Sequence, residues 1–334
     1  CFCLWAAAAA SQPLNGHAGR SSGPPLVLAS PTYLALRWQR MSPHGTKRGF
    51  SLEFFPPKTE PGRARLLKSV QRLTQIAPSF VSVTFGAGGS AREGSFQTAS
   101  EIMRTVDLEV APHLSCIGST REEIAALLDT YREIGVKRIV ALRGDVPASE
   151  PDLPRAFGNA NELVRFIREA GGFDISVAAY PEFHPEAPSA AADVENFVRK
   201  VHAGASEAIT QYFYSNDAYY RFLEWVRRMG VEIPVVPGVM PMTDFAQVAR
   251  FSQFCGAEIP GWISKRMQAL EHDKHGQEEL GIELATRQTE DLLRNGAPGI
   301  HSYTLNRAEP TLRIWNALGL SHSATHKRHQ PSTN

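Results

Sequence analysis

A single carboxylate, Glu53, stands in an otherwise apolar stretch, Ser51-Leu-Glu-Phe-Phe-Pro-Pro57. Burying an ionised carboxylate among aromatic side chains without a partner is costly, so burial favours the protonated form and raises the pKa. A carboxyl group with a raised pKa suits a general acid, which gives a proton to a substrate. The alternative is a salt bridge between Glu53 and a basic group, and the local sequence does not choose between the two.

The tripeptide Arg143-Gly144-Asp145 places a cation, a flexible joint and an anion directly after an apolar run. An arginine can bind phosphate through parallel hydrogen bonds, and a carboxylate can contact the polar edge of a ring. The tripeptide could therefore contact a phosphorylated cofactor, or it could form an Arg–Asp ion pair in an ordinary loop. Both interpretations stay open.

The segment Gly86-Ala-Gly88-Gly-Ser-Ala91 lies between a strand-like run and a helical pattern, as in a loose G-x-G-x-x-A dinucleotide fingerprint. That fingerprint also needs an acidic residue at the end of the next strand, where it binds the ribose. The next predicted strand instead ends in Pro112-His-Leu-Ser115. A Rossmann-type NAD-dependent dehydrogenase is therefore the weaker alternative.

Metal chemistry is not predicted. His272 and His275 lie in a charged run typical of a solvated face, and no Cys-x-x-Cys pair occurs among the four cysteines, Cys1, Cys3, Cys116 and Cys255. Lys and Arg number 35 against 34 Asp and Glu, which gives no broad surface for nucleic acid or an anionic membrane. No apolar run reaches the roughly 18 residues of a membrane span. We therefore expect a soluble, cytoplasmic enzyme that acts on small molecules.

The scaffold that must position these residues extends over residues 48–320, where β-branched or aromatic runs alternate with amphipathic stretches. This alternation is typical of βα units and a parallel sheet. Helical patterns include residues 63–76, 120–134 and 193–203, the second with a Thr120–Glu123 capping box. Eight strands are predicted, at residues 49–54, 80–85, 109–115, 137–142, 173–179, 207–213, 233–239 and 299–304. Eight such units predict an α/β fold, a single-domain (β/α)8 TIM barrel with extra helices before the last strand.

Polar side chains gather where these predicted strands end. They are Glu53, Thr84, His113, Arg143 with Asp145, Tyr180 with His184, Gln211 and Arg307. The carboxyl ends of barrel strands form one mouth, which holds the active site in barrel enzymes. We therefore expect these side chains to surround one catalytic site.

Both ends of the sequence lack sustained periodicity. We expect residues 1–47 to be a disordered or non-native N-terminal extension, with a natural start at Met41, and residues 321–334 to be a disordered tail. The catalytic domain is then predicted to be residues 48–320.

Eight sequence blocks, in order, resemble the methylenetetrahydrofolate reductase family in its bacterial-type, catalytic-domain-only form. They are Leu52-Glu-Phe-Phe-Pro-Pro57, Val81-Ser-Val-Thr-Phe-Gly-Ala87, Ala111-Pro-His-Leu114, Ala141-Leu-Arg-Gly-Asp145, Ala179-Tyr-Pro-Glu-x-His-Pro185, Ile209-Thr-Gln-Tyr-Phe213, Pro237-Gly-Val-Met-Pro241 and Tyr303-Thr-Leu-Asn-Arg-Ala-Glu309. The resemblance extends over almost all of residues 48–320, with the blocks at compatible spacing, which makes a merely shared fold a poor explanation.

The resemblance implies a barrel with non-covalently bound FAD. Such an enzyme takes hydride from NADH or NADPH and, in a ping-pong reaction, reduces 5,10-methylenetetrahydrofolate to 5-methyltetrahydrofolate for one-carbon metabolism and methionine synthesis. By position, Glu53 matches the general acid, with Asp145 as a second catalytic residue. The implied FAD-binding residues are Thr84, Phe85, Ala87, His113, Arg143, Gly144, Asp145, Asn159, Ala160, Tyr180, His184, Ala187, Asp193, Asn196, Arg199 and Lys200. The implied substrate-binding residues are Thr84, Asp145, Gln211, Gln247, Phe251, Leu305 and Arg307.

Two positions depart from the family pattern. Phe85 stands where the family often has Tyr, and Asn159 stands where an aromatic residue commonly precedes Ala160. We also expect a homo-oligomer and, since the chain ends near residue 320 where eukaryotic members continue into a regulatory domain, no inhibition by S-adenosylmethionine. A barrel that binds flavin or folate without turning it over is the alternative outside enzymes.

Overall fold

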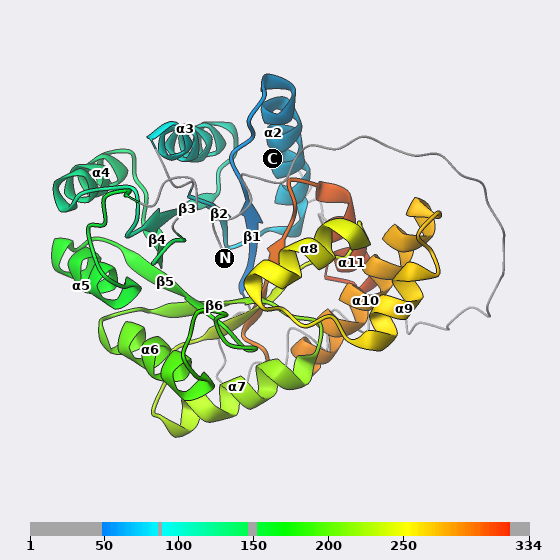
Figure 1. The fold of residues 1–334 in the computed structure, drawn as a ribbon. Coiled ribbons are helices and arrows are strands. Elements are labelled where there is room, and N and C mark those ends of the chain that lie inside the picture. The colour runs from blue at the N-terminus through cyan, green and yellow to red at the C-terminus, as the bar shows by residue number, and fades with distance from the viewer. Residues whose placement is uncertain (1–48, 86–88, 146–151, 321–334) are drawn as a thin grey trace, which may run out of the picture.

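The computed structural model describes residues 49–85, 89–145 and 152–320, which form a closed barrel of eight strands (Figure 1). Every neighbouring pair of strands is parallel, and β1 closes the barrel by pairing with β8. The strands are β1 (Gly49–Phe54), β2 (Phe80–Val83), β3 (Glu109–Ser115), β4 (Arg138–Leu142), β5 (Asp174–Ala179), β6 (Glu207–Tyr212), β7 (Val235–Val239) and β8 (Gly299–Tyr303). The predicted TIM barrel is confirmed, and its closed sheet excludes the open sheet of the Rossmann alternative.

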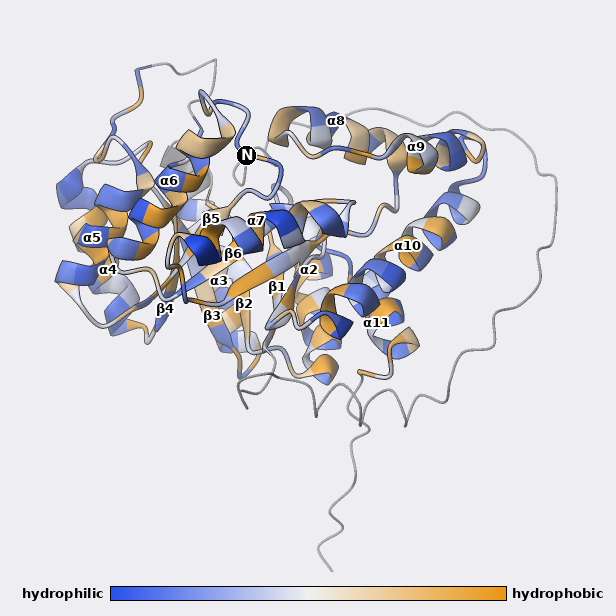
Figure 2. Cartoon of the chain, turned by 90° about the horizontal axis from the view of Figure 1, so that it is seen from below, coloured by the Kyte–Doolittle hydropathy of each residue, from blue (hydrophilic) through white to orange (hydrophobic). Residues whose placement is uncertain are grey.

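A layer of helices surrounds the strands. It comprises α2 (Glu60–Leu73), α3 (Gly89–Thr105), α4 (Arg121–Glu133), α5 (Ala160–Ala170), α6 (Ala190–His202), α7 (Asn216–Arg228), α10 (Lys274–Arg294) and α11 (Ala308–Ala317). Along these helices hydrophobic and hydrophilic residues alternate, as Figure 2 shows, so one side of each can pack on the sheet. The outward-facing strand residues, such as Val81 and Val83, join the helices in one apolar cluster.

Capping residues decide where the helices begin. The predicted capping box of Thr120 and Glu123 is present at the start of α4. The helix predicted to begin at residue 63 begins at Glu60, because the Thr59 side chain accepts a hydrogen bond from the Gly62 amide. This helix ends at Leu73 and continues as a 3-10 turn over Thr74–Ile76.

Two extra helices, α8 (Phe245–Cys255) and α9 (Gly261–Gln268), lie between β7 and α10. Figures 1 and 2 both show them at one end of the barrel, outside the ring of helices. The Tyr212 hydroxyl lies 3.3 Å from Ser252 Oγ and 3.2 Å from Cys255 Sγ, so α8 is held against the carboxyl end of β6. The predicted extra helices before the last strand are confirmed.

The opposite end of the barrel is built around Arg138, at the start of β4. Its guanidinium lies 2.9 Å from Glu109 Oε1, 3.5 Å from Asp174 Oδ2 and 3.6 Å from Glu207 Oε1. It also lies 4.8 Å from the centre of the Phe80 ring. Glu109, Asp174 and Glu207 are the first residues of β3, β5 and β6, so Arg138 links the amino-terminal ends of these strands to that of β4.

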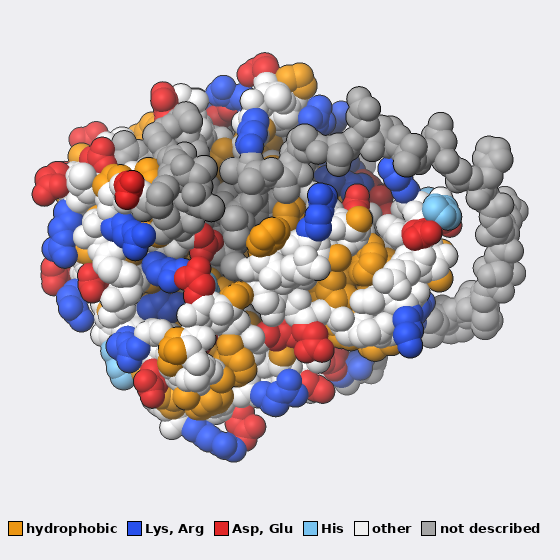
Figure 3. All heavy atoms as spheres, viewed as in Figure 1, with side chains coloured by type: hydrophobic (Ala, Val, Ile, Leu, Met, Phe, Trp, Pro, Cys, Tyr) orange, Lys and Arg blue, Asp and Glu red, His pale blue; other side chains and the backbone are white. Residues whose placement is uncertain are grey.

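The surface carries no dominant charge on the face shown in Figure 3, where basic and acidic side chains are interspersed. No helix in the described part of the chain is long and apolar enough to cross a membrane. The predictions for residues 1–47 and 321–334 lie outside the described residues.

Candidate active site

Glu53 lies on the inner side of β1, between two histidines from other strands. Its Oε2 atom is 3.6 Å from His113 Nε2 on β3 and 3.6 Å from His301 Nε2 on β8. The residue is 6% exposed, and within the described part of the chain Oε2 has no hydrogen-bond partner. Burial raises the pKa of Glu53 well above its usual value of 4.5.

Neither histidine forms a salt bridge with Glu53 at neutral pH. Burial lowers the pKa of His113 to about 3, with a further contribution from His301, and burial also lowers the pKa of His301 to about 3. Both imidazoles are therefore neutral, beside a carboxyl group whose pKa burial raises. The geometry favours the general-acid interpretation of Glu53 over the salt bridge.

The sequence did not single out His301. Its Nδ1 atom lies 2.8 Å from Ser51 Oγ, and Ser51 pairs with His301 in the β1–β8 register. This contact orients the imidazole and leaves Nε2 facing Glu53. Because Ser51 and His301 are 250 positions apart, only the register that closes the barrel could have identified the pair.

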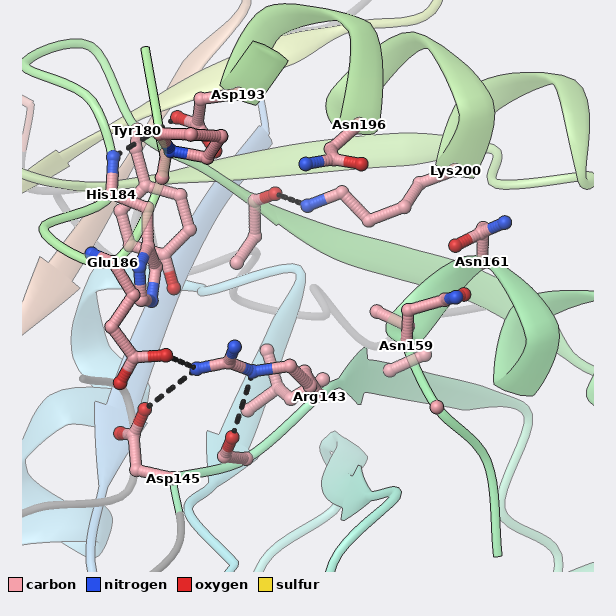
Figure 4. Close-up of a pocket in the computed structure, with 18 residues that line it drawn as sticks. Arg143, Asp145, Asn159, Asn161, Tyr180, His184, Glu186, Asp193, Asn196 and Lys200 are labelled. Atoms are coloured by element: carbon pink, nitrogen blue, oxygen red, sulfur yellow. Dashed lines mark hydrogen bonds and ion pairs between the residues drawn. The ribbon is translucent and has the colours of Figure 1, made fainter. Parts of the chain in front are cut away.

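A pocket with a cavity volume of about 230 Å³ opens at the carboxyl ends of β4 and β5 (Figure 4). Most of the residues predicted to bind a cofactor line it: Arg143, Gly144, Asp145, Asn159, Ala160, Tyr180, His184, Ala187, Asp193, Asn196 and Lys200. The lining also includes residues that the prediction missed, Ala141, Leu142, Gly158, Asn161, Ala178, Glu186 and Pro188. The structure therefore brings together residues from four separate segments of the chain, 141–145, 158–161, 178–188 and 193–200.

The pocket holds two cationic side chains. Arg143 Nη2 lies 2.5 Å from Glu186 Oε2 and 3.7 Å from Asp145 Oδ1, as the dashed lines in Figure 4 show. Lys200 donates a hydrogen bond to the Ala178 carbonyl, and burial lowers the pKa of Lys200 to about 8. Both cations could turn from these partners to an anionic ligand.

The turn after β4 needs a glycine. Gly144 has a φ of +82°, and a Cβ on it would lie 2.0 Å from Ser115 Oγ. That hydroxyl donates a hydrogen bond to the Arg143 carbonyl, at 3.1 Å. Ser115 at the end of β3 therefore fixes the turn from which Arg143 and Asp145 reach the pocket.

The loop after β5 forms the opposite wall of the pocket. The Tyr180 and His184 rings meet edge to face, with centres 4.8 Å apart. The His184 amide donates to Asp193 Oδ2 on α6, and the Glu186 amide donates to His184 Nδ1. These hydrogen bonds stabilise the conformation of the loop that contains the motif Tyr-Pro-Glu-x-His-Pro.

Four other described residues that were predicted to bind the cofactor do not line this pocket. Thr84 is buried just after β2, and His113 lies beside Glu53. Phe85 packs in the outer apolar cluster, and Arg199 is exposed and donates to Asn196 Oδ1. Ala87 lies outside the described residues. Their roles stay predictions.

Besides Thr84 after β2 and Asp145 after β4, the predicted substrate residues come from β6, α8 and the connection after β8. Gln211 is buried and accepts a hydrogen bond from the Tyr212 amide, whereas Phe251 is almost completely buried on α8. Gln247 is also on α8, Leu305 is left-handed with a φ of 54°, and Arg307 is exposed and pairs with Glu278 at 2.8 Å. These elements all lie at the carboxyl end of the barrel.

No group of His, Cys, Asp or Glu in the described ranges could hold a metal ion. The described residues of the site thus combine a buried carboxyl group with a raised pKa, two neutral imidazoles and a pocket lined by Arg143 and Lys200.

The family model described as methylenetetrahydrofolate reductase matches residues 39–319. The chain is 40% identical to a 5,10-methylenetetrahydrofolate reductase of Pectobacterium carotovorum and 39% identical to one of Escherichia coli. Each alignment covers 81% of this chain and 90% of the relative.

Among solved structures, the chain resembles an uncharacterized protein from Clostridium thermocellum that binds two copies of 5-methyl-5,6,7,8-tetrahydrofolic acid. The TM-score is 0.56 and the identity 16%, over 87% of this chain and 98% of that one, so this likeness shows the fold alone.

Proposed function

Because the chain belongs to the methylenetetrahydrofolate reductase family, we propose that it reduces 5,10-methylenetetrahydrofolate to 5-methyltetrahydrofolate, with FAD as bound cofactor and NADH or NADPH as hydride donor. The observation that carries the proposal is the buried Glu53 carboxyl group on the inner side of the barrel, whose pKa burial raises, at the same end of the barrel as the pocket that holds Arg143 and Lys200. The reaction belongs to one-carbon metabolism, and its product feeds methionine synthesis.

The pocket residues fit a flavin dinucleotide. The cavity itself has a volume of about 230 Å³, below the roughly 300–1,000 Å³ of complete ligand pockets, so it would enclose part of the cofactor and leave the rest in the open mouth. Arg143 and Lys200 supply positive charge for the diphosphate, and the amides of Asn159 and Asn196 supply donors and acceptors for polar groups. Ala141, Leu142 and Ala178 give an apolar surface for a ring. When bound, the flavin would accept a hydride from the nicotinamide and then pass it to the folate, in a ping-pong reaction.

Glu53 performs the proton transfer. Its carboxyl group gives a proton to a nitrogen of the five-membered folate ring, which opens the ring to an iminium that can accept the hydride. Burial raises the pKa of Glu53 and so favours the protonated form that this role needs. The neutral imidazoles of His113 and His301, both 3.6 Å away, can then hydrogen-bond to the carboxylate that remains, after a small shift.

The other predicted residues bind and orient the substrates. Asp145 would contact the flavin ring edge and the pterin. Gln211 would contact the folate and the nicotinamide in turn, and Phe251 would pack against each of these two substrates. Thr84, Gln247, Leu305 and Arg307 complete the folate contacts. We also propose NADH as the preferred donor, a homo-oligomeric state and a cytoplasmic location.

A visible absorption spectrum of the purified protein tests the function. We expect bound flavin, which NADH bleaches and methylenetetrahydrofolate restores. A protein that cannot take up FAD would contradict the cofactor assignment. If flavin binds and bleaches but the folate does not restore its colour, the alternative of a barrel that binds without turnover is favoured.

A further inference from the structure

Strand β6 contains a bulge at the residues that precede Tyr212. Ile209 pairs with Val236 and Tyr212 pairs with Gly238, so three steps along β6 match two steps along β7. The extra residue lies at Thr210 or Gln211. Bulges of this kind often lie next to active sites, where they redirect a side chain.

The bulge changes which side chains face the inside of the barrel. In a regular strand, Ile209 and Phe213 would lie on the same face, because side chains alternate with a period of two. Here Ile209 and Tyr212 pack in the apolar cluster inside the barrel, whereas Ala208 and Phe213 pack in the outer cluster, between the strands and the helices. Gln211, which we propose contacts both substrates, lies within the segment where the alternation is broken.

Contacts from two other strands fix the bulge at Thr210. The Gly238 amide donates to Thr210 Oγ1 at 2.9 Å, and the Tyr303 hydroxyl donates to the Thr210 carbonyl at 2.8 Å. A bulge interrupts the backbone ladder, and buried backbone groups need partners, so the Tyr303 hydroxyl replaces a ladder contact.

Gly238 makes room for the Tyr303 ring. A Cβ at position 238 would lie 2.5 Å from Tyr303 Cε2 and 2.4 Å from the Thr210 carbonyl oxygen. Distances under 3 Å cannot be accommodated without a shift of backbone or ring. The bulge, the glycine and the tyrosine therefore form one unit.

We propose that Tyr303 is a positioning residue, which holds the β6 bulge and thereby sets the position of Gln211 for folate and nicotinamide. The inference rests on the proposed function, because it concerns how that site binds its two substrates. Gln211 does not line the pocket that contains Arg143 and Lys200, so the role of Tyr303 is in substrate binding and not in FAD binding.

The test compares Tyr303→Phe with Tyr219→Phe. Tyr219 is a matched control, since its buried hydroxyl also donates to a strand carbonyl, that of Val235, at 2.8 Å, but it packs in the outer cluster. Both variants lose one buried hydrogen bond, so we expect similar falls in melting temperature. Only Tyr303→Phe should raise the KM values for both substrates, by about tenfold, with kcat, its pH profile and the FAD dissociation constant unchanged.

A second measurement does not depend on activity. The Tyr212 amide donates to Gln211 Oε1, so hydrogen exchange of that amide reports on the Gln211 side chain. We expect faster exchange in a peptide containing Tyr212 for Tyr303→Phe, and exchange like that of the unmodified protein for Tyr219→Phe.

A double variant decides whether Tyr303 acts through Gln211. The KM values of Tyr303→Phe/Gln211→Ala should be no higher than those of Gln211→Ala alone, because residues in one unit are not additive. Additive effects, an unchanged KM in Tyr303→Phe, or a shifted pH profile of kcat would each overturn the inference. Failure of the unmodified enzyme to turn over methylenetetrahydrofolate would instead overturn the proposed function, and the exchange experiment would still test the bulge.

Discussion

Glu53 and His301 face each other across the seam where the first strand of the barrel pairs with the last, with Oε2 and Nε2 3.6 Å apart. Both groups are buried, and burial raises the pKa of the carboxyl group and lowers that of the imidazole. Each shift favours the neutral form, so burial opposes an ion pair between the two groups. This is the arrangement that the proposed general-acid role of Glu53 requires.

Glu53→Gln should separate the two halves of the reaction. The variant keeps the shape of the side chain and removes the acid, which only the folate half needs. In stopped-flow experiments we expect bleaching of the flavin by NADH to stay within about tenfold of the unmodified enzyme, whereas its recovery with methylenetetrahydrofolate falls by at least about 100-fold. Equal slowing of both halves would mean that Glu53 organises the flavin site, and no slowing would mean that it is not the acid.

His301→Gln should reduce the acid sensitivity of the fold. The pKa of His301 is about 3 in the folded protein against 6.5 for the ordinary side chain, so between these values the unfolded chain binds more protons. The free energy of unfolding therefore falls as pH falls through this window. We expect urea titrations to show a pH slope smaller by about 1.4 kcal/mol per pH unit in the variant. His202→Gln, on the exposed surface of α6, is the control, and an equal slope in all three proteins would contradict the assignment.

Arg143→Ala should weaken FAD binding more than it slows the reaction. A contact to phosphate contributes to binding of the cofactor, and the contact is the same before and during the reaction. We expect the FAD dissociation constant to rise by at least about tenfold, with kcat at saturating FAD within about threefold. Arg228→Ala removes an exposed ion pair with Glu224 on α7 and should change neither quantity. An unchanged dissociation constant in Arg143→Ala would show that the pocket holds the diphosphate elsewhere.

Glu182→Gln should stabilise the protein at alkaline pH. Glu182 accepts a hydrogen bond from the Glu258 amide at 3.0 Å, which joins the loop after β5 to the segment between α8 and α9. Burial raises its pKa to about 7, so the folded state binds more protons than the unfolded state between pH 4.5 and 7, and stability falls as pH rises through that range. Glutamine keeps an acceptor and cannot ionise.

The advantage of Glu182→Gln in melting temperature should therefore grow from pH 5 to pH 8. Glu182→Ala, which has no acceptor, should melt below the unmodified protein at both values. Glu195→Gln on α6 is the exposed control. An advantage that does not change with pH would contradict the buried, titrating carboxylate.

Arg138→Gln should destabilise the fold without affecting catalysis per folded molecule. The substitution leaves Glu109, Asp174 and Glu207 near one another without their shared cation. We expect the free energy of unfolding to fall by about 1–3 kcal/mol, because the cluster is only partly buried and its loss costs more than an exposed ion pair and less than a buried one. Adding Glu207→Gln should recover part of this loss, and full activity with unchanged stability in Arg138→Gln alone would show that the cluster is not structural.

The sequence predicted the strands within two residues at each end, because buried parallel strands are short apolar runs with clear limits. Helix starts were less accurate: residue 193 was predicted for α6, which begins at Ala190 because the Ser189 side chain caps it. Eleven of the sixteen residues that the family resemblance assigned to the cofactor line the pocket. Arg143, Tyr180 and His184 follow strands whose carboxyl ends meet, whereas Asn196 and Lys200 lie on α6 and came from the resemblance alone. His301 and the β6 bulge could not be predicted, because both depend on register between strands that are distant in sequence.

The proposed acid and the proposed cofactor pocket occupy different parts of the barrel. Glu53, His113 and His301 are rigidly placed on β1, β3 and β8, whereas the pocket is shaped by the connections after β4 and β5. Protein engineers could therefore vary the pocket loops to accept altered flavins, in a library that leaves the proton donor untouched. The same separation would allow directed evolution to explore cofactor preference and substrate chemistry as two independent searches.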